Sequence, residues 1–417
     1  LKRHKRSKTP HREDERSRPR VDAPRRNRRV LSTPDAMAES QPGDGAAVGE
    51  ATLEDRPVFR WADISATVAR FGPYEMVKTL PSERDQNFLL RLAGGGVSED
   101  AAPQPNVAMA VFKVHNPNDE FAFVECQSEA LDRVSAYGAN CQRLLRTTDT
   151  GEMFVALPCT SPDGSTRPCQ CRMFSFLPGQ MLADAAASVD DSTRAKLFEA
   201  VGEAVGSVTA ALCGFDHAAA HRDFYWDLRC CEEVIKARSS YVHEDRRALL
   251  GGFLARYCQD IKPTLPRLRK SVVHNDPNDY NLVVLDNGRV GVLDFGDMVY
   301  SYTCADAAIG MAYLLLHCPV GSSLVECVLP FVCKYHQMCP LTEDEARVLF
   351  GLAIMRICTS VCMSAYQSSL EPDNPYLLIS SKPAWALLER LAAGGEETSA
   401  PARLLRACGF ADHIGPQ

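Results

Sequence analysis

The sequence lacks the features that mark several common classes of protein. No run of about 18 apolar residues occurs, which argues against a membrane-spanning helix. The first residues are too charged for a secretory signal. The 17 cysteines include no two CxxC pairs, so their spacing favours neither a zinc site nor a disulfide framework. Scattered, reduced and buried thiols in a cytoplasmic protein are the expected alternative.

Positive charge is concentrated at the start of the chain. Residues 1–36 hold 13 Lys or Arg and 5 Asp or Glu, a net charge of +8 within a chain total of −7. Residues 1–56 have too few large apolar side chains to offset the entropy of ordering, so we expect a disordered tail. A basic tail suits nucleic acid or a nuclear signal, but the first methionine is Met37, and translated upstream sequence explains it equally well. The remaining chain carries −15, which suits a cationic substrate and no nucleic acid, although a solvated acidic surface is commoner.

Hydrophobic periodicity predicts an α+β protein in two parts. The first part, residues 57–179, is expected to be a small antiparallel sheet with one helix that ends at Gly138. The second part, residues 180–417, is expected to be larger and mostly helical. The expected strands are 74–82, 85–94, 106–116, 143–151, 153–159 and 171–179; the expected helices are 120–137, 192–213, 222–239, 244–261, 301–317, 321–337, 344–367 and 381–393.

Two spaced motifs stand in the middle of the second part. VVHNDPNDYN, residues 272–281, contains H-x-D-x-x-x-x-N, the spacing of a kinase catalytic loop. LVVLDNGRVGVLDFGD follows, with an Asn-Gly hairpin turn and a second strand that ends at Asp294 in Asp-Phe-Gly. Phosphoryl transfer needs a carboxylate to orient the nucleophile and magnesium, held by hard oxygen ligands, to neutralise the phosphates. The agreement of both motifs with the hairpin argues against a merely polar turn.

On these residues the chain resembles the aminoglycoside phosphotransferase and choline kinase superfamily, and within it the hydroxylysine kinases. Further segments that carry the resemblance are LPSERDQNFLL, FLPGQ and MSAYQSSLEPDNPYLLISSKPAWALLERL, and it covers about residues 59–395. The chain departs from the family pattern at Asn275, where glycine is usual, and at Pro277. The resemblance implies a protein-kinase-like fold of two lobes with a nucleotide between them. It also implies transfer of the terminal phosphate of GTP, or ATP, to the hydroxyl of 5-hydroxy-L-lysine.

The resemblance assigns roles to the residues of the two motifs. Asp276 is expected to be the base that orients the substrate hydroxyl, with His274 bracing its loop. Asn281 and Asp294 are expected to bind Mg²⁺.

Residues of the first part are expected to hold the nucleotide. Lys113, in AMAVFKV, stands where a kinase lysine holds the α and β phosphates. Glu125 or Glu129 would pair with it from the helix, and the resemblance favours Glu125. No GxGxxG is present. The turn between the first two strands offers three possible phosphate donors, or a simple hairpin turn instead: Ser82, Gln86 and Asn87.

Acidic residues near the catalytic loop are candidates for a cationic hydroxylated amine, namely Asp279 and Asp297. Two alternatives remain at this point. One is a kinase for another amino alcohol, such as choline, ethanolamine or an aminoglycoside-like compound. The other is an inactive nucleotide-binding module, which the presence of Lys113, Asp276 and both expected metal ligands argues against.

Overall fold

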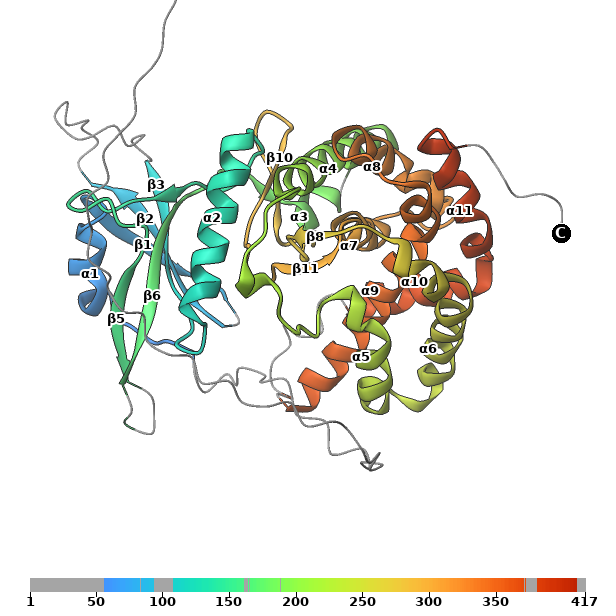
Figure 1. Ribbon diagram of the computed structural model, residues 1–417, viewed down its shortest axis with the longest axis horizontal. Helices are drawn as coiled ribbons and strands as arrows, with labels where there is room; N and C mark the ends of the chain where they lie inside the picture. Colours follow the sequence, from blue (N-terminus) through green and yellow to red (C-terminus); the bar gives the residue numbers. More distant parts are fainter. Residues whose placement is uncertain are drawn as a thin grey trace, which may run out of the picture. The chain divides into compact units, whose positions relative to one another are not determined.

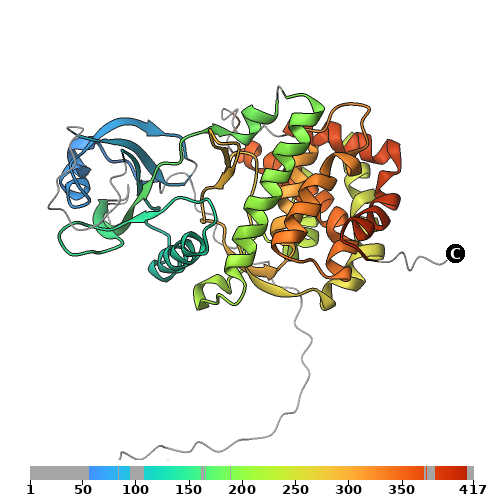
Figure 2. The ribbon, with the colours of Figure 1, turned by 90° about the horizontal axis from the view of Figure 1, so that it is seen from above.

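The computed structural model describes residues 56–82, 84–93, 108–160, 164, 166–187, 189–370, 372 and 381–410. These residues belong to one compact unit, Val48–Gln417 (Figures 1 and 2). The expected tail, apart from Arg56, lies outside the described residues.

A six-stranded sheet forms the first part, in the order β1-β2-β3-β6-β4 with β5 paired to β6, and every pairing is antiparallel. Its strands are β1 Tyr74–Leu80, β2 Gln86–Leu92, β3 Met109–Val114, β4 Leu144–Leu145, β5 Val155–Thr160 and β6 Thr166–Ser175. The expected strand 143–151 is wrong beyond Leu145, because Thr147 and Gly151 close a turn there. Strand β6 begins at Thr166, five residues before the expected start at residue 171.

Two helices cover opposite faces of this sheet. Helix α1 (Trp61–Ala69) packs on the face that carries Phe88, Phe112 and Met173. Because side chains alternate along a strand, Lys113 and its cross-strand neighbour Arg172 point to the other face, where α2 (Phe121–Tyr137) lies. Helix α2 ends at Gly138, in the left-handed conformation with φ 93°, as expected for a glycine that terminates a helix.

The second part combines helices with two small sheets. One sheet has three strands, with β9 (Leu282–Val284) between β10 (Val290–Val292) and β7 (Gln180–Met181). The other has two strands, β11 (Val299–Tyr302) and β8 (Lys270–Val273). The helices are α3 Leu182–Ala186, α4 Asp191–Leu212, α5 Cys231–Arg238, α6 Glu244–Arg256, α7 Ala305–Leu315, α8 Leu324–Met338, α9 Glu343–Leu370, α10 Ser381–Gly394 and α11 Glu396–Ala407.

Most of the expected helices of this part are confirmed, with two corrections at their starts. The helix expected to begin at residue 301 begins at Ala305, because Ser301 and Tyr302 pair with β8. The helix expected from residue 222 begins only at Cys231, after a 3₁₀ turn whose N-cap is Asp227.

The helices pack around a second hydrophobic core, and the site is built on that core. Helices α4 and α8 approach so closely that a side chain at Gly202 would overlap the Phe331 carbonyl. Helix α9 is long and apolar enough to cross a membrane, which the sequence analysis did not anticipate. In this structure 78% of the most apolar 18-residue stretch of α9 is buried, as in the core helix of a globular protein. Every residue of α7 is buried as well.

Candidate active site

The loop after β8 is held by a buried carboxylate from α7. Asp306 accepts hydrogen bonds from the backbone N–H groups of His274 (3.1 Å) and Asn275 (2.7 Å), and from the Thr209 hydroxyl (3.2 Å). Burial raises the pKa of Asp306, while these backbone donors oppose that shift. From the sequence, Asp306 is one of the acids near the catalytic loop that would suit a cationic substrate, and its role in holding the loop was not predicted, although an acid in the first turn of an otherwise apolar helix was a visible signal.

The backbone reverses direction at Asn275, which has φ 67°. This is the position where the resembled family usually has glycine. Asparagine is one of the few other residues that adopts the left-handed region readily, so the departure preserves the turn.

The His274 ring joins the two ends of the motif segment. Its Nε2 lies 2.9 Å from the Leu293 carbonyl oxygen, and its Nδ1 accepts from the backbone N–H of Asp276 at 3.2 Å. A carbonyl only accepts and a backbone N–H only donates, so the ring is neutral with its proton on Nε2. The Phe295 ring packs edge-on against it.

The Asp276 carboxylate accepts three hydrogen bonds. Its Oδ2 receives the side-chain amides of Asn278 (2.8 Å) and Asn281 (2.7 Å), and its Oδ1 receives the Arg356 guanidinium at 2.7 Å. Burial raises the pKa of Asp276 well above its ordinary value, and the Arg356 charge opposes that shift.

Arg356 is a site residue that the sequence analysis missed. It comes from α9, its side chain is 2% exposed, and it also donates to the Trp226 carbonyl at 2.8 Å while lying over the Trp226 ring. The available signal was a lone arginine in the apolar helical run AIMRICTSV.

The expected metal ligands lie at the open end of one hairpin, Asn281 just before β9 and Asp294 two residues after β10. The Leu293 N–H donates to the Asn281 carbonyl at 2.8 Å, which brings Asp294 beside Asn281. Asn281 uses its amide nitrogen on Asp276, so its amide oxygen has no donor among the described residues. Asp294 has φ 53°, its side chain is 48% exposed, and the Lys113 charge lowers its pKa. An amide oxygen and an ionised carboxylate are hard donors that fit Mg²⁺.

Lys113 points into the same site, with its Nζ 2.9 Å from Asp85 and 3.4 Å from Asp294. The expected pairing with a helix carboxylate is wrong: Glu125 is only partly buried, Glu129 is exposed, and among the described residues neither forms an ion pair with Lys113. Helix α2 instead turns Gln127 and Ser128 toward the sheet, where they bind Arg172.

The three expected phosphate donors have different surroundings. Both ends of the Gln86 side-chain amide bind the backbone of Phe59 (2.7 and 3.0 Å), so Gln86 joins the segment before α1 to β2 and is not offered to phosphate. The Ser82 hydroxyl accepts from the Asp85 N–H at 3.2 Å. Asn87 lies opposite Lys113 in the sheet, and its buried Oδ1 has no partner among the described residues.

The two expected substrate carboxylates also differ. Asp279 is buried and bound to His317 at 2.8 Å, which favours a structural role over the expected contact with substrate. Asp297 is partly exposed. Burial and the negative charge of the neighbouring Asp294 raise the pKa of Asp297. The positive charges of Arg356 and two other arginines lower it by a smaller amount.

Several known proteins are similar to this chain over most of its length. The family model described as "Phosphotransferase enzyme family" matches residues 97–316. The chain is 26% identical over 360 residues to the hydroxylysine kinase of Mus musculus, covering 82% of this chain and 92% of that one. A solved amicoumacin kinase in complex with AMP-PNP and Ca²⁺ is similar at 14% identity, with a TM-score of 0.57 over 80% of this chain and 94% of that one. A choline kinase from Cryptosporidium parvum is similar at 10% identity, with a TM-score of 0.51 over 82% and 98%. The α+β fold is therefore shared with the amicoumacin kinase and the choline kinase.

Proposed function

This chain belongs to the phosphotransferase enzyme family and is a small-molecule kinase, and on that premise we propose that its acceptor is 5-hydroxy-L-lysine, with GTP or ATP as donor. The observation that carries the proposed chemistry is the contact of Asp276 with Asn281 and of Lys113 with Asp294. The similarity to hydroxylysine kinase, which spans most of both chains, supports the choice of acceptor.

In the proposed reaction the sheet-rich and helical parts act as two lobes with the nucleotide between them. Lys113 binds the phosphates nearest the nucleoside, and Asn281 and Asp294 hold Mg²⁺, which neutralises phosphate charge when bound. The acceptor oxygen forms a bond to the terminal phosphorus as the bond to the bridging oxygen breaks. The nucleoside diphosphate leaves, and the hydroxyl proton passes to Asp276.

The hydrogen bonds of Asp276 suit it to orient a single hydroxyl. A carboxylate offers about four acceptor positions. Asn278, Asn281 and Arg356 occupy three, two on Oδ2 and one on Oδ1, which leaves one position on Oδ1 for the acceptor. The acceptor hydroxyl of 5-hydroxylysine lies next to an ammonium group, and Asp297 is the carboxylate that we propose binds it.

A substrate panel tests the acceptor. The purified chain with Mg²⁺ and GTP or ATP is offered 5-hydroxy-L-lysine, L-lysine, ethanolamine, choline and an aminoglycoside, and products are identified by mass spectrometry. We expect phosphohydroxylysine, and no product from lysine, which lacks the hydroxyl. Asp276→Asn should lower turnover by roughly 10²–10⁴-fold, the range for a positioned acid–base group. Nucleotide affinity, measured by calorimetry, should change little.

Two other outcomes would contradict the proposal at different levels. Phosphorylation of choline or ethanolamine, but not of hydroxylysine, would refute the acceptor and leave the chemistry intact. Nucleotide binding without phosphorylation of any acceptor in the panel would refute the proposed reaction itself.

A further inference from the structure

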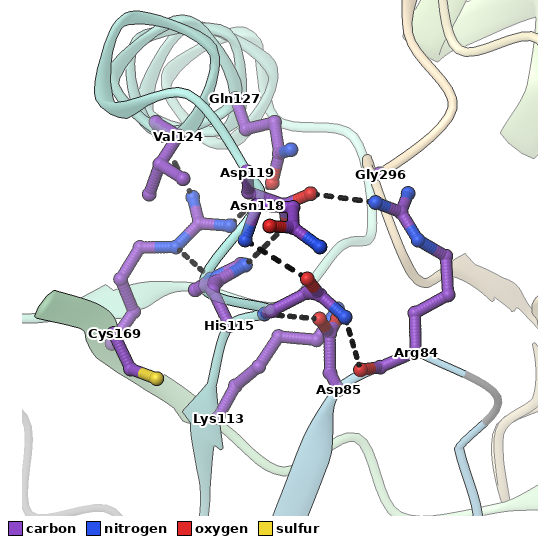
Figure 3. A network of polar contacts seen from close by, with 12 residues as sticks. Arg84, Asp85, Lys113, His115, Asn118, Asp119, Val124, Gln127, Cys169 and Gly296 are labelled. Atoms are coloured by element: carbon purple, nitrogen blue, oxygen red, sulfur yellow. Dashed lines mark hydrogen bonds and ion pairs between the residues drawn. The ribbon is translucent and has the colours of Figure 1, made fainter. Parts of the chain in front are cut away.

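The turn between β1 and β2 carries a carboxylate that contacts Lys113 directly. Asp85 Oδ2 lies 2.9 Å from Lys113 Nζ, and both side chains are nearly buried, at 13% and 12% exposure. The other oxygen of Asp85 accepts the backbone N–H of Asn116 at 3.0 Å. Figure 3 shows Asp85 and Lys113 within one network of polar contacts.

The short contact and the bond from the Asn116 N–H favour the charged form of both groups. Burial alone would favour neutral forms, but the Lys113 charge and the Asn116 N–H hold the pKa of Asp85 well below its usual range. Burial alone would lower the pKa of Lys113. The negative charges of Asp294 and Asp85 raise it by more than burial lowers it, so the pKa lies above its ordinary value. Each charge therefore stabilises the other, as in a buried ion pair with additional hydrogen bonds.

A second contact fixes the same turn to the segment that precedes α2. Arg84 binds Asp119 at 2.7 Å, and the Asn116 side chain donates to the Arg84 carbonyl at 3.3 Å (Figure 3). The turn is thus anchored at Arg84 as well as at Asp85, and the Asp85 carboxylate cannot rotate away from Lys113 without losing its bond to the Asn116 N–H.

The cluster of Asp85, His115 and Asp119 has ligand atoms close enough together for a metal ion, but its chemistry argues against one. The Nε2 of His115 accepts from Arg172 at 2.9 Å, so the ring proton lies on Nδ1, which faces Asp119 at 3.6 Å, and neither nitrogen is free to bind a metal. Lys113 and Arg172 already supply positive charge to the cluster.

We infer that Asp85 is the positioning residue for Lys113, in place of a carboxylate from helix α2. This inference rests on the proposed function, in which Lys113 binds the nucleotide phosphates. Because Asp85 belongs to the turn between β1 and β2, the orientation of the lysine depends on that turn and not on α2. Helix α2 supplies uncharged groups, Gln127 and Ser128, to the neighbouring Arg172.

The first test measures how firmly the Lys113 amine is held and needs neither an acceptor nor turnover. Asp85→Asn keeps an oxygen for the Asn116 N–H and removes the negative charge. The Lys113 amine, released from its 2.9 Å contact with Asp85, should then react faster with an amine-acylating reagent, by roughly tenfold, as expected when a hydrogen bond between charged groups is lost. The acylation rate of Lys113 is followed by mass spectrometry at pH 8.5. Glu125→Gln and Glu129→Gln are the matched controls and should leave the rate unchanged.

The second test measures turnover. Loss of a hydrogen bond to a charged group should lower kcat by roughly 10–100-fold in Asp85→Asn, by the usual strength of such a bond. Asp85→Glu, which keeps the charge, should recover part of the loss, and both helix controls should stay within about twofold. In a Lys113→Met background, Asp85→Asn should have no further effect, because its role is to position that lysine.

The inference is overturned if Asp85→Asn leaves the acylation rate of Lys113 unchanged, or if Glu125→Gln accelerates it. An equal loss of turnover from Asp85→Asn in the Lys113→Met background would also overturn it. If Asp85→Asn does not fold, the acylation rate of Lys113 is compared in Asp85→Glu and in the Glu125→Gln control, and that comparison decides the question. If no acceptor is phosphorylated by the unaltered chain, the proposed function fails while the acylation test remains decisive for Asp85.

Discussion

Replacement of Arg356 by methionine should damage both the stability and the catalysis of this kinase. Methionine preserves the length and apolar body of the side chain but removes the charge that faces Asp276. The change also removes the donors to Oδ1 of Asp276 and to the Trp226 carbonyl. Asp276 keeps its two asparagine donors and loses Arg356, the one cation bound to it among the described residues.

The expected loss of stability follows from the burial of the pair. The two side chains are 2% and 16% exposed, and removal of one partner from a buried ion pair costs about 3–5 kcal/mol. For a unit of the length Val48–Gln417, an unfolding entropy of about 2.1 cal/mol/K per residue converts this to a fall of about 4–6 °C in the melting temperature. Turnover should fall by at least about tenfold, because the carboxylate loses its orientation and part of its ionised population.

The sign of the pH dependence separates this mechanism from a simple packing defect. Burial raises the pKa of Asp276, and Arg356 holds it down, so methionine should raise it further. In the folded Arg356→Met variant, Asp276 then takes up a proton at a higher pH than it does in the unfolded chain. Protonation removes the buried negative charge that has lost its partner. Its loss of stability should therefore be larger at pH 8 than at pH 5.

Differential scanning calorimetry across this pH range, with turnover measured on the same samples, tests the prediction. Arg347→Met is the matched control on the same helix, because Arg347 forms an exposed pair with Glu343 that should contribute less than about 1 kcal/mol. Asp276→Asn combined with Arg356→Met should recover stability but not turnover. A melting temperature within about 1 °C of the original chain, or a larger loss at pH 5 than at pH 8, would refute the reasoning.

Two further variants test the remaining assignments. Asp294→Asn should abolish most turnover in excess Mg²⁺ while leaving the melting temperature nearly unchanged, because its side chain is half exposed; unaltered turnover would contradict its role as a metal ligand. Asp279→Asn should lower the melting temperature by disturbing the buried contact with His317, and leave the KM of the acceptor unchanged; a raised acceptor KM with an intact fold would return Asp279 to the substrate site.

The part of the site that could be predicted from the sequence is the part that lies within one continuous segment. His274, Asp276, Asn281 and Asp294 occur within about twenty residues, and a tight hairpin leaves few ways to arrange them. Strand alternation and the end of α2 at Gly138 were likewise local properties, and the structure agrees with both. The spacing of short-range motifs therefore determined the geometry.

The errors arise where distant segments meet. Lys113 had two candidate partners on the helix that follows it, yet its actual partner comes from a turn that precedes it, because α2 presents Gln127 and Ser128 to the sheet. Arg356 lies 80 residues beyond Asp276 in the sequence, and only the packing of α9 brings them together. Ser301 and Tyr302 were expected in a helix, but pairing with β8 overrides that local preference.

Backbone strain supports the same location for the site without reference to any motif. Among the described residues, only Asn275 and Asp294 combine a side chain with a positive φ. Such a conformation costs of order 1–3 kcal/mol and persists only where neighbouring bonds enforce it. Asp306 holds the N–H of Asn275, and the Gly296 N–H binds the Asp294 carboxylate at 3.0 Å. One strained residue immediately precedes Asp276, the proposed catalytic aspartate, and the other is the expected metal ligand. The fold therefore holds unfavourable backbone conformations where the proposed chemistry needs precise placement.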